Sequence, residues 1–532
     1  MPKNMPHKGT QGRRALTLSL ALAMSACTVV GPDYQAPPQP VLPSSWTAEE
    51  LATESEEIGA WWQRFNDPIL TNLIERGAQQ NLSIEAAGLR IVQARAALGI
   101  ADALIFPQQQ QLNGNFTGLY QNKEWFKSAG ASFDVGWEID IWGKYARGIE
   151  SAEAGLYASI ASYHDVLVTI SAEIARNYIN YRTAQERKYL SQRNIAIQQR
   201  VVDMTEVKFK AGDVSELDVQ QAKTQLYATQ SALPALSIAQ SQARNALAVL
   251  LGTVPENVQG LLGLEEPRAP ASFSDGFNDI QRGTITVNSY SQDSVIPKAP
   301  QLTSGINPQL VLRRPDLQVA ELSTRAQSAR IGLTAAELYP QFYLFGSVGV
   351  NQTVKHDKSF GFSDAVTAAV GPGISWNIFQ YGRIKNQIRV EDARFQESLT
   401  NYNQSVLQAV AEVSNAIDTY QNTLEKSDYD FEGVKASIRA FSISATQYNN
   451  GLVSYQRLLS TVEKMTLRED AYAQTRGNIS QQVVALYKAL GGGWQPLEGK
   501  PLKPETVEQM KARVDWGDQL EPQAIEGGDL SE

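Results

Sequence analysis

An internal repeat is the feature of this sequence that most restricts its fold. The segment GWEIDIWGK at 136–144 returns as ISWNIFQYGR at 374–383, at an offset of 239 residues. The same offset relates Gly212 to Gly451, and upstream of these segments corresponding residues lie 233 apart. The difference of six between the two offsets needs only a small loop insertion. We therefore expect two copies of one structural unit of about 200 residues.

Residues 1–26 have the composition of a secretory signal. Basic residues precede an apolar run at 15–24 that is too short to span a bilayer as a mature helix. Small residues then precede Cys27, the only cysteine, so no internal disulfide can form. The pattern resembles a bacterial lipobox, which implies cleavage before Cys27 and its acylation by diacylglycerol and an N-acyl chain. Thr28, in place of the Asp of retained lipoproteins, implies the outer membrane; an ordinary signal with an incidental cysteine is the alternative.

The charge of the mature chain argues against nucleic acid as a partner. Removal of the signal takes away four positive charges and no acids, so the net charge falls from −9 to −13. After residue 27 no apolar stretch is long enough for a transmembrane helix. Residues 514–532 contain six acids and no base, and we expect them to form a disordered tail.

Two long proline-free stretches, one in each repeat, permit very long helices, because helices usually end near proline. In the first stretch, apolar residues recur at spacings of four and three, at Leu156, Ile160, Tyr163, Leu167, Ile170 and Ile174. A mean spacing of 3.5 residues is typical of coiled coils. One helix from about 144 to 211 would be about 100 Å long. Turns at Gly212 and Gly451 then predict a helical hairpin in each repeat; a soluble coiled-coil rod would share this pattern.

Alternating apolar and polar residues predict one β-hairpin in each repeat, at about 108–142 and about 341–381. In the first hairpin one face carries Phe133, Val135, Trp137, Ile139 and Ile141, and the other carries Asp134, Gly136, Glu138 and Asp140. Residues 123–127 are predicted as its loop, and Ile374, Trp376 and Ile378 as a strand of the second hairpin.

The strand lengths, and aromatic residues at the strand ends, favour a membrane β-barrel over a soluble sheet. These aromatic residues are Trp125, Trp142, Tyr339 and Tyr381. Four strands cannot close a barrel, and open sheet edges are not tolerated in lipid, so several chains must share one barrel.

Several motifs resemble those of the outer membrane factor family of tripartite efflux pumps, the TolC-like proteins, and in particular its OprM/NodT-type lipoproteins. The motifs are GPDY at 31–34, RRPDL at 313–317, YKALGGGW at 487–494, and the two hairpin turns FKAG at 209–212 and YNNG at 448–451. The resemblance covers residues 28 to 495, nearly the whole mature chain.

This resemblance implies a mainly α-helical protein with a β-barrel part. Three copies would form one twelve-stranded outer-membrane barrel above a long helical barrel in the periplasm. The expected regions are an anchored segment at 27–64, a first repeat at 65–252, a linker at 253–307, a second repeat at 308–494 and a C-terminal segment with an acidic tail at 495–532. The family function is an exit duct for small molecules such as drugs. Its partners are a periplasmic adaptor and an inner-membrane transporter of the resistance-nodulation-division (RND) type.

Other functions remain open at this point. After signal removal only His164 and His356 are left, and no cysteine nucleophile or phosphate-binding glycine loop is available, which argues against an enzyme and a metal centre. A non-conducting rod or adhesin is a second alternative. A duct that exports proteins is a third, since fold alone does not determine the cargo.

In the family the constriction lies after the turn of the second repeat, which places gate candidates at both hairpin tips. They are Tyr448, Arg457, Ser460 and Glu463 in the second repeat, with Asp218 and Gln221 at equivalent positions of the first. We expect Asp218 and Arg457 to attract each other near the tips, although each residue could also belong to a merely solvated helix face. In the barrel, Asp134, Glu138 and Asp140 are expected to face the lumen and to favour cations.

Overall fold

The computed structural model of the protein describes residues 29–37, 42, 58–263, 294–301, 308–361, 363 and 365–520. The predicted signal, Cys27 and most of the 253–307 linker lie outside this part of the chain. The short helix η1 (Trp61–Phe65) precedes the first repeat, which contains α3 (Pro68–Gln80), α4 (Leu82–Ala103), β1 (Gln109–Gln121), β2 (Glu124–Ile139), α5 (Lys144–Ala211) and α6 (Glu216–Leu250), with α7 (Pro255–Leu261) following. The second contains η3 (Pro308–Arg313), α10 (Pro315–Ala336), β3 (Gln341–Lys355), β4 (Val366–Ser375), α11 (Arg383–Asn449) and α12 (Tyr455–Ala489). The C-terminal segment contains η5 (Gln495–Leu497), α13 (Pro504–Arg513) and η6 (Gly517–Leu520).

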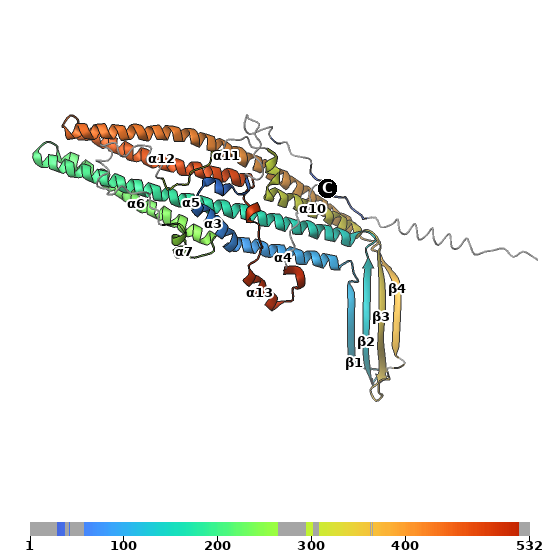
Figure 1. Cartoon of the computed structure of the whole chain (residues 1–532). Coiled ribbons are helices and arrows are strands. Elements are labelled where there is room, and N and C mark those ends of the chain that lie inside the picture. The colour runs from blue at the N-terminus through green and yellow to red at the C-terminus, as the bar shows by residue number, and fades with distance from the viewer. Residues whose placement is uncertain are drawn as a thin grey trace, which may run out of the picture.

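The predicted long helices and their hairpins are confirmed. α5 has 68 residues and α11 has 67, and each returns through a 35-residue partner. Gly212 ends α5 with a positive φ of 85°. Its amide donates to the carbonyl of Phe209, and the amide of Asp213 donates to that of Lys208. The two hairpins, α5/α6 and α11/α12, lie side by side, and the sheet extends from the opposite end of the helices (Figure 1).

The repeat is visible in single hydrogen bonds. Trp137 Nε1 donates to the carbonyl of Ile105 at 2.9 Å, and Trp376 Nε1 donates to that of Leu338 at 3.0 Å. In each copy the donor follows the 239-residue offset and the acceptor the 233-residue offset. Each tryptophan therefore joins the end of one strand region to the short segment that connects the preceding helix to the hairpin.

The sheet is antiparallel in the order β1-β2-β3-β4, and the pairing of β2 with β3 joins the two repeats. Two strand predictions are wrong. β4 ends at Ser375, so Trp376 and Ile378 follow the strand; Trp376 instead makes the hydrogen bond to Leu338 just described. The turn of the first hairpin is only Asn122-Lys123, both with positive φ, and the rest of the predicted loop belongs to β2.

Helix order changes along the molecule. Near the sheet, α5 packs between α4 and α10, whereas near the tips it packs between α6 and α12. One large core joins η1 and α3 to α5, α11 and α12, and a second core lies between the two hairpins. No helix in the described part of the chain is both long and apolar enough to cross a membrane.

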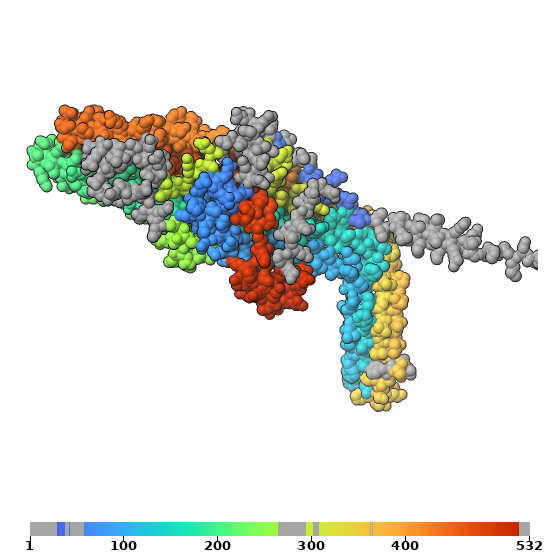
Figure 2. Space-filling model, in the orientation of Figure 1, coloured from blue at the N-terminus to red at the C-terminus, as the bar shows by residue number. Residues whose placement is uncertain are grey.

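The C-terminal segment packs against the middle of the helices, over α3 and α4 (Figure 2). The prediction of a disordered tail from residue 514 is wrong for its first seven residues. Leu520 at the end of η6 is 8% exposed and packs with Val92 and Met510. Apolar residues among the acids anchor this stretch, and an average composition over 514–532 conceals them. Residues 521–532 lie outside the described part.

Candidate functional site

The two faces of the sheet differ in chemistry. Leu112, Phe133 and Val348 are aligned across three strands on one face and are 81%, 44% and 51% exposed in the single chain. We call this the outer face, and the face that carries Asp134 the inner face. Trp142 stacks on Tyr339 at 4.7 Å where the sheet meets the helices. A wide exposed apolar face ending in aromatic residues is typical of contact with lipid.

The three predicted luminal acids have different environments. Asp134 lies on the inner face and accepts hydrogen bonds from Asn113 and Ser132, each at 2.8 Å, and from Ser347. Glu138 is on the same face, but Lys144 Nζ lies 3.2 Å from its carboxylate and the Tyr145 hydroxyl donates to it. These contacts offset the charge of Glu138, so Asp134 is the stronger candidate for a luminal acid.

The third acid, Asp140, lies one residue beyond β2, which ends at Ile139. Its carboxylate accepts from the amide of Ala146 at 2.9 Å, at the start of α5. Asp140 therefore caps a helix, and its inclusion in an alternating strand is a correction to the sequence prediction.

At the periplasmic tips the side chain of Tyr448 is buried within the protomer. It is 2% exposed, with Lys208 Nζ 4.9 Å from the ring centroid and the ring of Tyr455 edge-on at 6.0 Å. Burial raises the pKa of Tyr448. The ring thus fastens α11 to α5 in this state, instead of projecting into open space.

Asp218 and Arg457 do not form an ion pair within the described protomer. Asp218 accepts from the amide of Ser215 at 2.9 Å and completes a capping box at the start of α6. Arg457 takes the same position of α12, where Ser454 makes no side-chain cap. Within one protomer the carboxylate of Asp218 therefore caps α6, and its attraction to Arg457 between neighbouring copies stays a prediction.

The other tip candidates are accessible. Arg457 and Glu463 are exposed, and Gln221 and Ser460 are partly exposed. A cation at the N-terminus of a helix opposes the helix dipole. Arg457 therefore does not stabilise α12, and its presence at this position needs another explanation.

A buried ion pair joins the two hairpins, and the sequence analysis did not identify it. Arg193 Nη2 of α5 lies 2.7 Å from Glu469 Oε1 of α12, and these side chains are only 4% and 0% exposed. Asn194 Nδ2 also donates to Glu469, at 2.9 Å. The next residue of α12, Asp470, accepts two hydrogen bonds from Arg187 of α5. This pair is more exposed, at 39% for Asp470 and 28% for Arg187. Charged residues inside a long helical pattern were the only sequence signal for these contacts.

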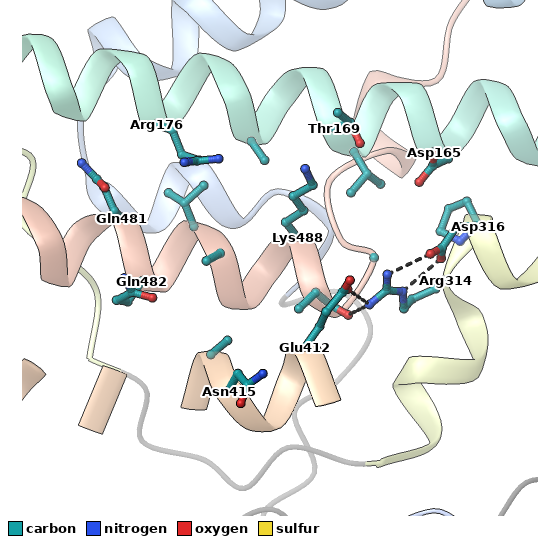
Figure 3. A pocket seen from close by; sticks show the side chains of 18 of the residues that line it. Asp165, Thr169, Arg176, Arg314, Asp316, Glu412, Asn415, Gln481, Gln482 and Lys488 are labelled. Carbon is teal, nitrogen blue, oxygen red and sulfur yellow. Dashed lines mark hydrogen bonds and ion pairs between the residues drawn. The ribbon is translucent and has the colours of Figure 1, made fainter. Parts of the chain in front are cut away.

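Arg314 of the RRPDL motif, which directly precedes α10, connects the start of this helix to α11 and α12 (Figure 3). Its Nη1 donates to Glu412 of α11 at 2.8 Å and to the carbonyl of Ala489, the last residue of α12, at 2.9 Å. The carboxylate of Asp316 accepts hydrogen bonds from Nε and Nη2 of Arg314. The first repeat has an uncharged counterpart of the contact between Arg314 and Ala489. At the equivalent positions, the side chain of Asn81 donates to the carbonyl of Leu250.

These contacts border a polar hollow of about 640 Å³ between α5, α10, α11 and α12 (Figure 3). Burial and, next, the charge of Asp316 raise the pKa of Asp165 in this hollow. Arg176 also lines it, whereas Ile174 and Tyr178 of the same helix pack in the core with η1 and α3. The hollow therefore opens on the side of α5 that is turned away from η1.

A histidine holds the C-terminal segment to α5. His164 stacks on Trp494 at 3.9 Å, and its Nε2 lies 3.0 Å from Glu498 Oε1. Burial lowers the pKa of His164, although Glu498 acts in the opposite direction. Among the described residues no cluster of three potential metal ligands is present.

The comparisons with known proteins agree with this architecture. The sequence model of the outer membrane efflux protein family matches residues 73–253 and 307–492. Nodulation protein T of Rhizobium leguminosarum bv. trifolii is 27% identical over 494 residues, covering 91% of this chain and 98% of the relative. The pyoverdine export outer membrane protein OpmQ of Pseudomonas putida is 26% identical over 503 residues, with 91% and 98% covered.

Among solved structures, the outer-membrane channel OprN aligns with a TM-score of 0.75 at 30% identity, over 88% of this chain and all of that one. The family prediction from the motifs is confirmed. The chain belongs to the outer membrane efflux protein family and serves in the outer membrane as the exit duct of a tripartite efflux system.

Proposed function

We propose that three copies of the chain close a single twelve-stranded barrel, through which small molecules pass passively from the periplasm to the exterior. The observation that carries this proposal is the open sheet. Within the described sheet β1 and β4 each have one neighbouring strand, while the outer face is apolar and exposed. Unpaired backbone groups are not tolerated in the hydrocarbon core.

The strand directions suit a closed ring. In the antiparallel order β1-β2-β3-β4 the two edge strands run in opposite directions. Under rotational symmetry, β4 of one copy can therefore pair in the antiparallel manner with β1 of the next copy. The helices support the same ring, since α4 and α6 lie at one edge of the protomer and α11 at the other.

Channel formation in planar lipid bilayers tests the proposal. We expect the purified protein to give long-lived unit conductances. A protein that binds the bilayer and forms no conducting unit would instead support the rod or adhesin alternative.

We propose further that the periplasmic end is closed by contacts between the helical hairpins. Tyr448, packed against Lys208, would hold α11 on α5, and the Arg193–Glu469 pair would hold α12 on α5 farther from the tip. Gln221, Ser460 and Glu463 would line the accessible faces. Arg457, with no helix-stabilising role, would meet an acid of a neighbouring copy.

The anchor remains a proposal because Cys27 lies outside the described residues. The segment that follows it is held where helices meet sheet: the amide of Val30 donates to the carbonyl of Trp142 at 3.0 Å, and Arg147 lies 2.6 Å from Asp33. A lipid on Cys27 would start within about 8 Å of Val29, close to the membrane surface. Diacylglycerol and N-acyl chains on Cys27 would strengthen the attachment to the membrane that the barrel already provides.

The partners and the cargo follow from family membership. We propose a periplasmic adaptor and an RND-type inner-membrane transporter as partners, with the transporter supplying the energy. The chain itself would catalyse no reaction and need no cofactor apart from the lipid. Drugs and other toxic small molecules are the proposed cargo, and co-purification with an adaptor would test the assembly.

A further inference from the structure

The inner face of the sheet carries mostly small and polar side chains, and large apolar or aromatic residues lie only towards its two ends. At the end far from the helices these are Leu119 and Phe126. Besides Asp134 and Glu138, its middle and lower rows carry glycine, alanine, serine, threonine and amide side chains, including Gln109, Gln111, Asn113, Asn115, Thr117, Ser128, Ser132, Ser347, Asn351 and Thr367. Tyr343 and Phe345 of β3 interrupt this lining at the end of the sheet next to the helices. Large aromatic side chains on a polar channel wall need an explanation beyond folding.

Glycines on the neighbouring strand make room for the two rings. Tyr343 is paired with Gly373 of β4, and a Cβ atom placed on Gly373 would lie 2.2 Å from the Tyr343 ring. Phe345 is paired with Gly371, where the corresponding distance is 3.5 Å. The rings therefore lie against the backbone of β4. They remain 37% and 42% exposed.

One unpaired carboxylate lies near these rings. Glu138 is the cross-strand partner of Tyr343, but Lys144 offsets its charge, whereas Asp134 is the partner of Ser347, two residues beyond Phe345. The three described hydrogen bonds to Asp134 come from neutral side chains, so its charge is not balanced by an adjacent cation. Aromatic faces and an ionised carboxylate together attract cations that carry planar apolar groups.

We propose that Tyr343 and Phe345, with Asp134 above them, form a cargo-contact subsite for aromatic organic cations at the entrance of the barrel. The inference rests on the proposed trimeric duct, in which three such pairs form a collar. Each ring contact changes occupancy by about 2- to 12-fold, which is 0.5–1.5 kcal/mol at 1.4 kcal/mol per tenfold. Contacts of this strength retain a molecule briefly and still release it, as conduction requires.

Block of single channels by two cations of equal charge tests the subsite. Tetraphenylphosphonium carries aromatic rings, whereas tetrabutylammonium carries alkyl chains. We expect the wild-type channel to be blocked more strongly by tetraphenylphosphonium, and we expect the double variant Tyr343→Ala with Phe345→Ala to weaken that block at least about threefold. Block by tetrabutylammonium should change less.

Three further variants separate the subsite from general effects. Tyr343→Phe keeps the aromatic ring, so tetraphenylphosphonium should block this variant as strongly as it blocks the wild type. Phe342→Ala with Leu344→Ala removes apolar side chains from the outer face of the same strand and should leave the selectivity between the two cations unchanged. Gly373→Ala should displace the Tyr343 ring and weaken the block without removing an aromatic residue.

The outcomes distinguish this inference from the function on which it rests. Conducting channels whose tetraphenylphosphonium block is unchanged in the double variant would refute the subsite and leave the duct intact. A wild-type protein that forms no channel would refute the duct and the subsite together. An equal loss of block in the outer-face control would also contradict the subsite.

Discussion

Removal of the buried carboxylate of Glu469 should destabilise the protein far more than removal of its neighbour. In Glu469→Ala the guanidinium of Arg193 stays 4% exposed and loses an oxygen at 2.7 Å. Loss of one partner of a buried pair costs about 3–5 kcal/mol, because the remaining charge is left without compensation. Asp470→Ala breaks a pair between the same two helices that is 28% and 39% exposed, so it should cost about 0–1 kcal/mol.

The assay is the free energy of unfolding of the detergent-solubilised protein, followed by the helical circular dichroism signal in denaturant. We expect a difference of about 2–5 kcal/mol between the two variants. Because the pair joins α5 to α12, Glu469→Ala should also raise channel conductance and let a large antibiotic leak inward. The double variant Arg193→Met with Glu469→Leu replaces the pair by apolar side chains and should recover most of the lost stability. Equal losses for Glu469→Ala and Asp470→Ala would refute the role assigned to burial.

Three further changes have defined outcomes. Arg457→Glu recreates at Ser454 the capping box of the first repeat, so α12 should gain about 0.3–1 kcal/mol while conductance rises; unchanged conductance would show that packing closes the end. Burial lowers the pKa of His164 below its unfolded value of about 6.5, so its contribution to stability is present above that pH and is lost as pH falls. His164→Phe should flatten this loss below about pH 6.5, measured by unfolding midpoints; an unaltered pH profile would exclude His164 as the cause. Cys27→Ser should abolish acylation, and mass spectrometry of the mature N-terminus checks this; an unmodified end at another residue in the wild type would contradict the anchor.

The repeat and the hydrophobic periodicities were sufficient to predict the helices and the two hairpins. α5 occupies the predicted span because a seam of apolar residues continues without proline to Gly212. Strand ends were harder to predict, since the alternation in sequence continues past Ile139 while the side chain of Asp140 already caps α5. Period alone cannot reveal where a backbone leaves a sheet.

The gate candidates were predicted from their positions in the sequence, and their contacts within the protomer were not. Tyr448 and Asp218 lie near the tips as the motifs predict. The ring of Tyr448 is buried within the protomer, and the side chain of Asp218 caps α6. The ion pair of Arg193 with Glu469 depends on the rotation of two helices separated by 276 positions in the chain. Sequence patterns within one helix do not fix that rotation.

Disulfide trapping between sheet edges tests the shared barrel most directly. Within one chain β2 and β3 separate β1 from β4 by about 14 Å, which exceeds the roughly 7 Å limit for a disulfide. A cysteine at Asn113 of β1, combined in turn with a cysteine at each position of β4, can therefore bond only between chains. For at least one combination we predict a ladder of one, two and three chains on non-reducing gels, with none in the single-cysteine controls. A ladder that continues beyond three chains, or no bond at any position of β4, would contradict the trimeric barrel.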